Sequence, residues 1–395
     1  MEVKIAVISD LHCHPETALP LDSFLLCERM RRPAREHPIE SLLELIRERK
    51  LSADALLVTG DITNKANKQG IISGWNFIKE VSAALSVSEL VATVGNHDID
   101  SRGLHSEDPF MVAKSFSPDD FPVSSAAARD DFWERGFCFV ETDSLCVLVV
   151  NSVLHHYSEA ETKRGKINDA QLERLERELE DRPGKAFRVA LIHHHPIPHE
   201  NLKLGADDLV VKGSELLDVL EKARFRIVVH GHKHYPRLRY ASGGGSAPTV
   251  FASGSLSAFN AQMLSNTRNL FHIIRLCDEP IPGCVGQGKI ESFEFNAGKG
   301  WSPPSKRSAD FPAIAGFGCR SSYTDLAEST IKVLGASSMG LQQWAAVQVS
   351  LPQVEYLLPG DFELYSKELE SRFRVKMYPA PPEIPYCIGR TEGGE

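Results

Sequence analysis

Short apolar runs, rich in β-branched residues, recur along roughly the first 300 residues and end in polar or glycine-containing turns. Apolar runs of this length are typical of strands buried on both faces, and their β-branched residues favour strands over short buried helices. The predicted strands are Val3–Ser9, Ala55–Thr59, Leu90–Val94, Leu145–Val150, Val189–Ile192, Ile227–Val229 and Val250–Ala252.

Segments with helical periodicity separate these strands. Within Ala170–Glu180, Leu172, Leu175 and Leu179 recur on one face while charged residues occupy the opposite face. Asn168 is the expected N-cap of this helix. Similar patterns cover Ile39–Leu51, Ile71–Leu85 and Ser214–Lys222. The alternation of strands and helices predicts a layered α/β fold.

The alternation of strands and helices ends before residue 298. The preceding strand-like stretches, Leu270–Leu276 and Lys289–Asn296, have no helix between them and suit antiparallel additions to a sheet. A Gly-, Pro- and Ser-rich stretch then begins at Gly298 and indicates a boundary. We therefore expect a domain of residues 1–297, a linker of residues 298–310 and a C-terminal extension of residues 311–395.

The expected extension contains two helix-like segments, Asp325–Leu334 and Phe362–Phe373, with a candidate strand, Ala346–Leu351, between them. This pattern predicts a small α/β unit. No motif in it indicates a function, and we consider self-association or partner binding as its role.

Composition narrows the possible partners. A net charge of −9 excludes a protein-wide basic field for gripping nucleic acid. No apolar run reaches the ~18 residues of a membrane span, and the N-terminal segment MEVKIAVISD enters a strand pattern without a signal peptide. The eight cysteines form no C-x-x-C pair, so we expect reduced thiols and a cytoplasmic protein.

Five short polar motifs follow predicted strands. In open α/β sheets, functional side chains gather beyond the carboxyl ends of the strands. Carboxylates, imidazoles and an amide are suitable ligands for divalent transition metals, and a preceding glycine lets the backbone turn sharply. The motifs are Asp10-Leu-His12, Gly60-Asp61, Gly95-Asn-His-Asp98, His193-His-His-Pro196 and Gly231-His-Lys-His234.

This ordered set resembles the calcineurin-like metallophosphoesterase superfamily, whose pattern is D-x-H, G-D, G-N-H-[DE], a later His and G-H-x-H. The match runs from Asp10 to His234. Each motif alone occurs often by chance, so the signal lies in their number and order. The resemblance implies a four-layer α/β/β/α sandwich formed by residues 1–297, with the small α/β extension added to it. Periodicity alone supports only α/β layers.

The resemblance also implies a site for two divalent metal ions. Manganese is our first choice, with iron, zinc, nickel or cobalt as alternatives. The implied ligands are Asp10, His12 and His234 for the first ion, Asn96, His193 and His232 for the second, and Asp61 as a bridge between the two.

The histidine run leaves one ligand open. The family ligand usually begins this run, which favours His193, with His194 as the alternative. Neighbours in an extended segment point to opposite faces, so we expect one or two of His193, His194 and His195 not to be ligands. We expect His230 to be a buried residue at a strand end.

Catalytic roles follow from the same resemblance. His97 would face the substrate and assist the leaving group, with Asp98 orienting its ring, and Asn96 and His97 would both contact substrate. Cys13 and His14 extend the first motif, but the family has no ligand at either position.

The resemblance implies hydrolysis of a phosphodiester by a hydroxide that bridges both ions. Motif spacing and the His-His-His-Pro segment look most like the class III cyclic-nucleotide phosphodiesterase branch, so cyclic nucleotides or similar small diesters are the first-choice substrates. A DNA or RNA nuclease of Mre11/SbcD type is second, and a phosphomonoesterase or protein phosphatase is third. A non-catalytic scaffold is least favoured because every ligand position is filled.

The long segment before the first helix is rich in Pro and Arg. One interpretation is a solvated surface loop. The other is a flap over the metals that supplies phosphate-binding cations, since long loops are often functional. On the second interpretation Arg29, Arg31 and Arg32 bind substrate.

Overall fold

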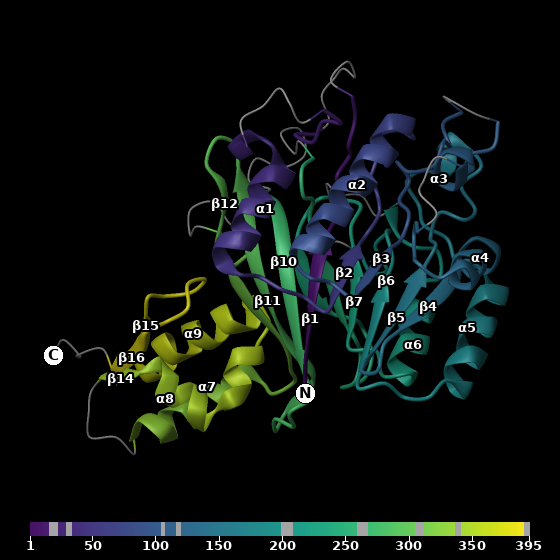
Figure 1. Cartoon of the computed structure of the whole chain (residues 1–395). Helices are drawn as coiled ribbons and strands as arrows, with labels where there is room; N and C mark the ends of the chain where they lie inside the picture. The colour runs from purple at the N-terminus through teal and green to yellow at the C-terminus, as the bar shows by residue number, and fades with distance from the viewer. Residues whose placement is uncertain are drawn as a thin grey trace.

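The computed structural model describes residues 1–15, 23–28, 34–103, 107–115, 120–198, 208–258, 268–304, 311–335 and 341–390. Two β-sheets pack face to face, and helices cover the outer side of each (Figure 1). The predicted four-layer α/β/β/α sandwich is therefore confirmed.

The first sheet has the strand order β12-β11-β10-β1-β2-β3, with β13 paired to β11. Strands β1, β2 and β3 are parallel, and β10 and β11 extend the sheet in antiparallel fashion, as predicted. The strands are β1 (Glu2–Ile8), β2 (Ala55–Val58), β3 (Glu89–Ala92), β10 (Asn269–Cys277), β11 (Cys284–Asn296), β12 (Gly300–Ser302) and β13 (Ile314–Cys319).

The second sheet has the order β4-β5-β6-β7-β9-β8, in which β5, β6, β7 and β9 are parallel. Strands β4 and β8 run antiparallel to their neighbours at the two edges. The strands are β4 (Phe137–Glu141), β5 (Leu145–Val150), β6 (Phe187–Leu191), β7 (Ile227–His230), β8 (Arg237–Tyr240) and β9 (Thr249–Ala252).

Strand β5 shows how the layers are held together. Val147 and Val149 belong to the core that the two sheets share. Leu148 and Val150 point the other way, into a second core that includes side chains of the outer helices. Because side chains alternate along a strand, one short apolar segment is buried on both faces.

Helices α1 (Pro38–Arg49) and α2 (Lys68–Ala84) cover the first sheet, and α5 (Asp169–Asp181) and α6 (Gly213–Lys222) cover the second (Figure 1). The N-cap predicted for α5 is confirmed, since Asn168 accepts a hydrogen bond from the backbone N–H of Gln171 at 2.9 Å. The described residues of this part also include the helices α3 (Met111–Ser115) and α4 (Ala126–Arg135) and the 3-10 turns Ala34–Glu36 and Glu159–Glu161.

The C-terminal extension has its own apolar core, which includes Trp344, Tyr365 and Leu369. Within its described residues, a sheet of order β14-β16-β15 lies beside the α-helices of the extension (Figure 1). Its elements are α7 (Tyr323–Gly335), β14 (Leu341–Gln343), α8 (Trp344–Ser350), the 3-10 helix η5 (Pro352–Tyr356), α9 (Pro359–Phe373), β15 (Val375–Tyr378) and β16 (Cys387–Arg390).

The strand predicted at Ala346–Leu351 is wrong, because most of this segment belongs to α8. Val347 and Val349 would share one face of a strand. In the helix Val347 is fully buried while Val349 is 84% exposed. The periodicity of a short apolar run cannot distinguish a strand from a buried helix. Here the segment is helical because Val347 packs in the core that includes Trp344 and Tyr365.

The predicted linker of residues 298–310 also contains regular structure. Gly300–Ser302 form β12, which pairs with the end of β11. Gly298 and Gly300 have φ angles of 82° and 85°, and this left-handed backbone makes the tight turn between the strands. The next strand, β13, belongs to the expected extension but pairs with β11 of the first sheet.

None of the helices in the described ranges is long and apolar enough to span a bilayer.

Candidate metal centre

The structure brings all seven predicted ligands to one edge of the sandwich. Each predicted ligand follows the carboxyl end of a strand that has a parallel neighbour. In both sheets these carboxyl ends lie at the same edge of the sandwich. Asp10 and His12 follow β1, Asp61 follows β2, Asn96 follows β3, His193 follows β6, and His232 and His234 follow β7.

A first group consists of Asp10, His12, Asp61 and His234, with one potential ligand atom of each within 4.8 Å of the other three. Nε2 of His12 is 3.7 Å from Oδ2 of Asp61 and 2.9 Å from Nε2 of His234. Nε2 of His234 is 3.3 Å from Oδ1 of Asp10. Both carboxylates are buried. Buried carboxylates need a compensating positive charge, so the group suits a cation.

A second group consists of Asn96, His193 and His232. Oδ1 of Asn96 is 3.2 Å from Nε2 of His193 and 3.0 Å from Nδ1 of His232. Nε2 of His193 is also 3.3 Å from Oδ2 of Asp61. The carboxylate of Asp61 therefore lies between the two groups, where one side chain can contact both.

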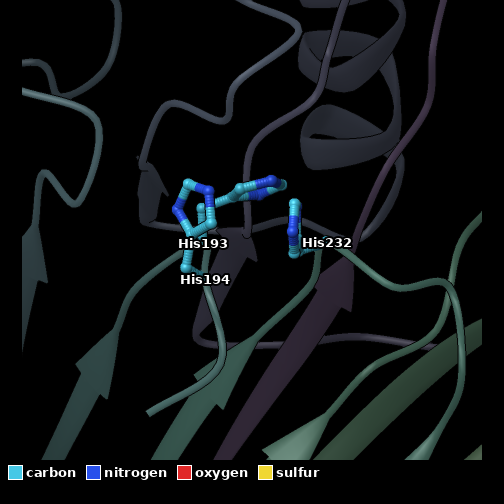
Figure 2. A group of neighbouring side chains, drawn as sticks. All are labelled: His193, His194 and His232. Carbon is cyan, nitrogen blue, oxygen red and sulfur yellow. The ribbon is translucent and has the colours of Figure 1, made fainter. Parts of the chain in front are cut away.

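The carbonyl of Thr59 distinguishes His193 from His194. Nδ1 of His193 lies 2.8 Å from the backbone oxygen of Thr59. Because a carbonyl can only accept, Nδ1 carries a proton and Nε2 is the atom left for a metal. Nδ1 of His194 instead contacts the hydroxyl of Ser152 at 2.8 Å. Figure 2 shows both rings beside His232. The geometry favours His193 as the histidine next to Asp61.

The backbone at the site adopts an uncommon conformation. Asp10, His12, Asp61, His232 and His234 have φ angles between 48° and 80°. Only a few per cent of non-glycine residues have positive φ, and such residues concentrate at functional sites because their cost must be offset by the surroundings. Five of the seven predicted ligands share this conformation, which aims their side chains at one edge.

The three glycines of the motifs act in two ways. Gly60 has a φ of 96°, which confirms a sharp turn before Asp61. Gly95 and Gly231 lack positive φ but leave space instead. A Cβ atom at Gly95 would overlap the Asp61 carboxylate and the His193 ring, and one at Gly231 would overlap the Asp10 carboxylate.

His97 lies beside the first group. Its ring is 4.6 Å from that of His12, measured between centroids, and its backbone N–H donates to Oδ1 of Asp61 at 2.7 Å. Nδ1 of His97 lies 3.0 Å from Oδ1 of Asn64. The ring is half-buried, unlike the fully enclosed Asp61.

The prediction that Asp98 orients the His97 ring is wrong. Oδ1 of Asp98 accepts hydrogen bonds from the backbone N–H groups of Ile62 and Thr63, at 2.7 and 3.0 Å, and Oδ2 accepts from Gly95 at 2.8 Å. Asp98 therefore ties the loop after β2 to the loop after β3. The backbone N–H groups of these loops lie within hydrogen-bond distance of the Asp98 carboxylate, and they bind it in place of the His97 ring.

Asp61 and His193 influence each other's charge. Burial alone raises the pKa of Asp61, but the His193 and His97 rings lower it well below its ordinary value. Burial alone lowers the pKa of His193, but the Asp61 carboxylate raises it to about 9. The site thus attracts positive charge. A bound metal ion would supply that charge, since metal binding replaces protons on its ligands.

Other predicted residues lie elsewhere. Arg29, Arg31 and Arg32 fall outside the described residues. Nδ1 of His14 lies 2.8 Å from the carbonyl of Pro15, and Sγ of Cys13 lies 3.8 Å from Sγ of Cys27, so neither joins the two groups. His230 is buried at the end of β7, as predicted.

Thr59, Asn64 and Asp208 also lie at the site but were not among the residues predicted for it. Oδ1 of Asp208 faces Nε2 of His232 at 3.9 Å, and Oδ2 pairs with the ammonium of Lys233. At that distance the two atoms are not hydrogen-bonded, so Asp208 lies beside the ring of His232 without binding it. No local motif marks these residues, because they become neighbours of the site only through the path of the folded chain.

Many solved structures are similar to this chain, and three of them are described below. A dimetal phosphatase from Danio rerio is 15% identical, with a TM-score of 0.46, and the match covers 75% of this chain and 99% of that chain. Purple acid phosphatase PPD1 from yellow lupin is 12% identical, with a TM-score of 0.49, and covers 76% of this chain and 52% of that chain. Vacuolar Protein Sorting 29 from Cryptosporidium parvum is 12% identical, with a TM-score of 0.34, covering 80% and 98%.

No curated protein sequence gives a significant match. A sequence model of the calcineurin-like phosphoesterases matches residues 3–236, a span that contains both ligand groups. Since this span is more than half of the 395-residue chain, the protein belongs to the calcineurin-like phosphoesterase family.

Proposed function

We propose that this protein hydrolyses small phosphodiesters with two divalent metal ions held by the first and second groups. One observation carries the proposal. Oδ2 of Asp61 is 3.7 Å from Nε2 of His12 in the first group and 3.3 Å from Nε2 of His193 in the second. A carboxylate in this position can bridge two ions, as a dinuclear hydrolytic site requires.

The donor set fits such a pair of ions. Imidazole nitrogens with carboxylate and amide oxygens suit manganese, iron, cobalt, nickel or zinc. When bound, the ions would activate water and offset negative charge on the phosphoryl oxygens. Asp10, His12 and His234 would hold the first ion, Asn96, His193 and His232 the second, and Asp61 both.

His97 would act on the leaving group. Its ring lies beside His12 but is not a member of either group. Contact with Asn64 holds the ring in place, and its incomplete burial leaves it accessible to a substrate. Donation of a proton or hydrogen bond to the departing oxygen typically contributes ~10²–10⁴-fold in rate. Asn96 would contact substrate as well as metal.

Two features support a small diester as substrate. The motif spacing and the His-His-His-Pro segment resemble the class III cyclic-nucleotide phosphodiesterase branch. The net charge of −9 does not favour extended nucleic acid as a partner. The Arg-rich segment of residues 29–35 favours nuclease activity as the second candidate, because guanidinium groups bind phosphates.

A substrate panel tests the proposal. Full-length protein loaded with manganese is assayed on cyclic AMP, a dinucleotide, single-stranded DNA, bis-p-nitrophenyl phosphate and p-nitrophenyl phosphate. We expect the highest kcat/KM on the cyclic nucleotide or the dinucleotide. A preference for DNA would support the nuclease instead, and a preference for the monoester would refute the diester proposal. No hydrolysis with any metal would refute the enzymatic function.

A further inference from the structure

His194 is a third histidine at the second group. Its side chain is fully buried and follows His193 directly after β6. Its ring centroid lies 4.4 Å from that of His232 and 5.0 Å from that of His193. Figure 2 shows the three rings gathered in one place, two from the end of β6 and one from the loop after β7.

The two nitrogens of His194 have different surroundings. Nδ1 lies 2.8 Å from the hydroxyl of Ser152, whereas Nε2 is buried and has no hydrogen-bond partner. A buried polar atom without a partner costs about 1–3 kcal/mol, so native structures rarely contain one. Serine holds the ring from behind, in the way that outer partners orient metal-binding histidines.

The ligand atoms are close enough to share one ion. One ring nitrogen from each of His193, His194 and His232 lies within 4.8 Å of the other two. Three nitrogens that bind one tetrahedral zinc ion at about 2.1 Å lie about 3.4 Å apart. The rings would therefore need to approach one another by up to about 1.4 Å. We propose that His194 is a ligand of the second metal ion, together with His193 and His232.

The neighbouring histidines do not compete for this role. Nε2 of His156 lies 2.7 Å from the carbonyl of Arg164, but its Nδ1 is buried without a hydrogen-bond partner, as Nε2 of His194 is. Among the described residues, neither His156 nor His195 belongs to the group of histidines whose ring nitrogens lie within 4.8 Å of one another. His195 therefore serves as the matched control for His194.

The additional ligand would make the two metal positions chemically different. The first has two carboxylates and two imidazoles, from Asp10, Asp61, His12 and His234. The second would have three imidazoles, the amide oxygen of Asn96 and the shared carboxylate of Asp61. Nitrogen-rich sites favour zinc, cobalt or nickel, whereas oxygen-rich sites suit manganese or magnesium. The second position would therefore select zinc over manganese more strongly than the first.

This inference rests on the proposed two-ion site, and a count of ligands tests it without measuring hydrolysis. Full-length protein with ¹⁵N-labelled histidine is loaded with ¹¹³Cd, and cadmium–nitrogen couplings are counted for each ion. We expect three imidazoles on one cadmium and two on the other. Two imidazoles on each would overturn the inference and leave the two-ion site standing. Failure to bind two cadmium ions would overturn both.

Variants provide a second readout. His194→Gln should remove one coupling from the three-histidine cadmium and weaken zinc binding at that position by more than about 10-fold. His195→Gln should change neither. Thermal unfolding of both metal-free variants shows whether they fold as the parent does. Unchanged zinc affinity in a folded His194→Gln protein would contradict the assignment.

Discussion

Oδ2 of Asp61 lies 3.3 Å from Nε2 of His193, although Asp61 follows a strand of the first sheet and His193 follows a strand of the second. The shared core between the sheets sets this distance. The carbonyl of Thr59, two residues before Asp61, also contacts Nδ1 of His193 at 2.8 Å. The metal centre is therefore a property of how the sheets pack together.

Replacement of Asp61 by alanine should abolish the bridge between the groups. We expect loss of at least one metal ion and a fall in kcat/KM of at least ~10²-fold, because a bound ion contributes several kcal/mol to catalysis. Elemental analysis and hydrolysis of bis-p-nitrophenyl phosphate measure the two effects. Asp143→Ala, at an exposed carboxylate, is the control. Wild-type turnover in Asp61→Ala would refute the bridging role.

His97→Gln should separate catalysis from metal binding. We expect both ions to remain while kcat falls by ~10²–10⁴-fold, the range typical of a lost general acid. Asn64→Ala should give a smaller loss, because it removes only the partner 3.0 Å from Nδ1 of the ring. Metal content and kcat are measured on the same preparations. Loss of the ions from His97→Gln would show that the residue is a ligand instead.

Gly95→Ala tests how closely the loops approach. The added methyl group would overlap the Asp61 carboxylate and the His193 ring, so we expect weaker metal binding and loss of activity. Gly184→Ala is the matched control, since a Cβ atom there meets nothing within 4 Å, and its stability should change by less than about 0.5 kcal/mol. Full metal content in Gly95→Ala would contradict the packing described for this loop.

The order of polar motifs was enough to predict which side chains gather at one edge of the sandwich. Asp10, Asp61 and His232 each follow a strand that can be recognised in the sequence by its apolar run. Because the carboxyl ends of parallel strands lie at the same edge of a sheet, these side chains are expected to lie close together. The small extension was also predicted, but α8 within it was not. Its apolar run fits either structure, and contacts with Tyr365, distant in sequence, decide between them.

Partners reached through backbone geometry could not be predicted. Asp98 stands next to His97 in sequence, yet its carboxylate binds the N–H groups of Ile62 and Thr63. Asn64 contacts the His97 ring from another loop, 33 residues earlier. Both arrangements depend on left-handed backbone at positions such as Asp61, which the residue type alone does not specify.

His272 should make stability depend on pH away from the metal centre. Burial lowers its pKa from 6.5 to about 4, with Nε2 held 2.8 Å from the carbonyl of Ser253. The unfolded chain takes up a proton near pH 6.5, whereas the folded protein does so only near pH 4. The free energy of unfolding therefore falls as the pH drops through this window, by up to ~3 kcal/mol from this group.

His272→Gln isolates this contribution. Urea unfolding at pH 7.5 and pH 4.5 should show a smaller pH dependence in the variant than in the parent protein. The other buried histidines contribute equally to both and cancel in the comparison. Equal slopes for His272→Gln and the parent would mean that His272 does not remain neutral in the fold.

Anomalous diffraction from crystals of the manganese-loaded protein would locate both ions. We expect two anomalous peaks about 3.5–4 Å apart, one beside Asp10, His12 and His234 and the other beside Asn96, His193 and His232, with the carboxylate of Asp61 touching both. Two peaks that lie away from Asp61, or a single peak at full loading, would contradict the proposed two-ion site.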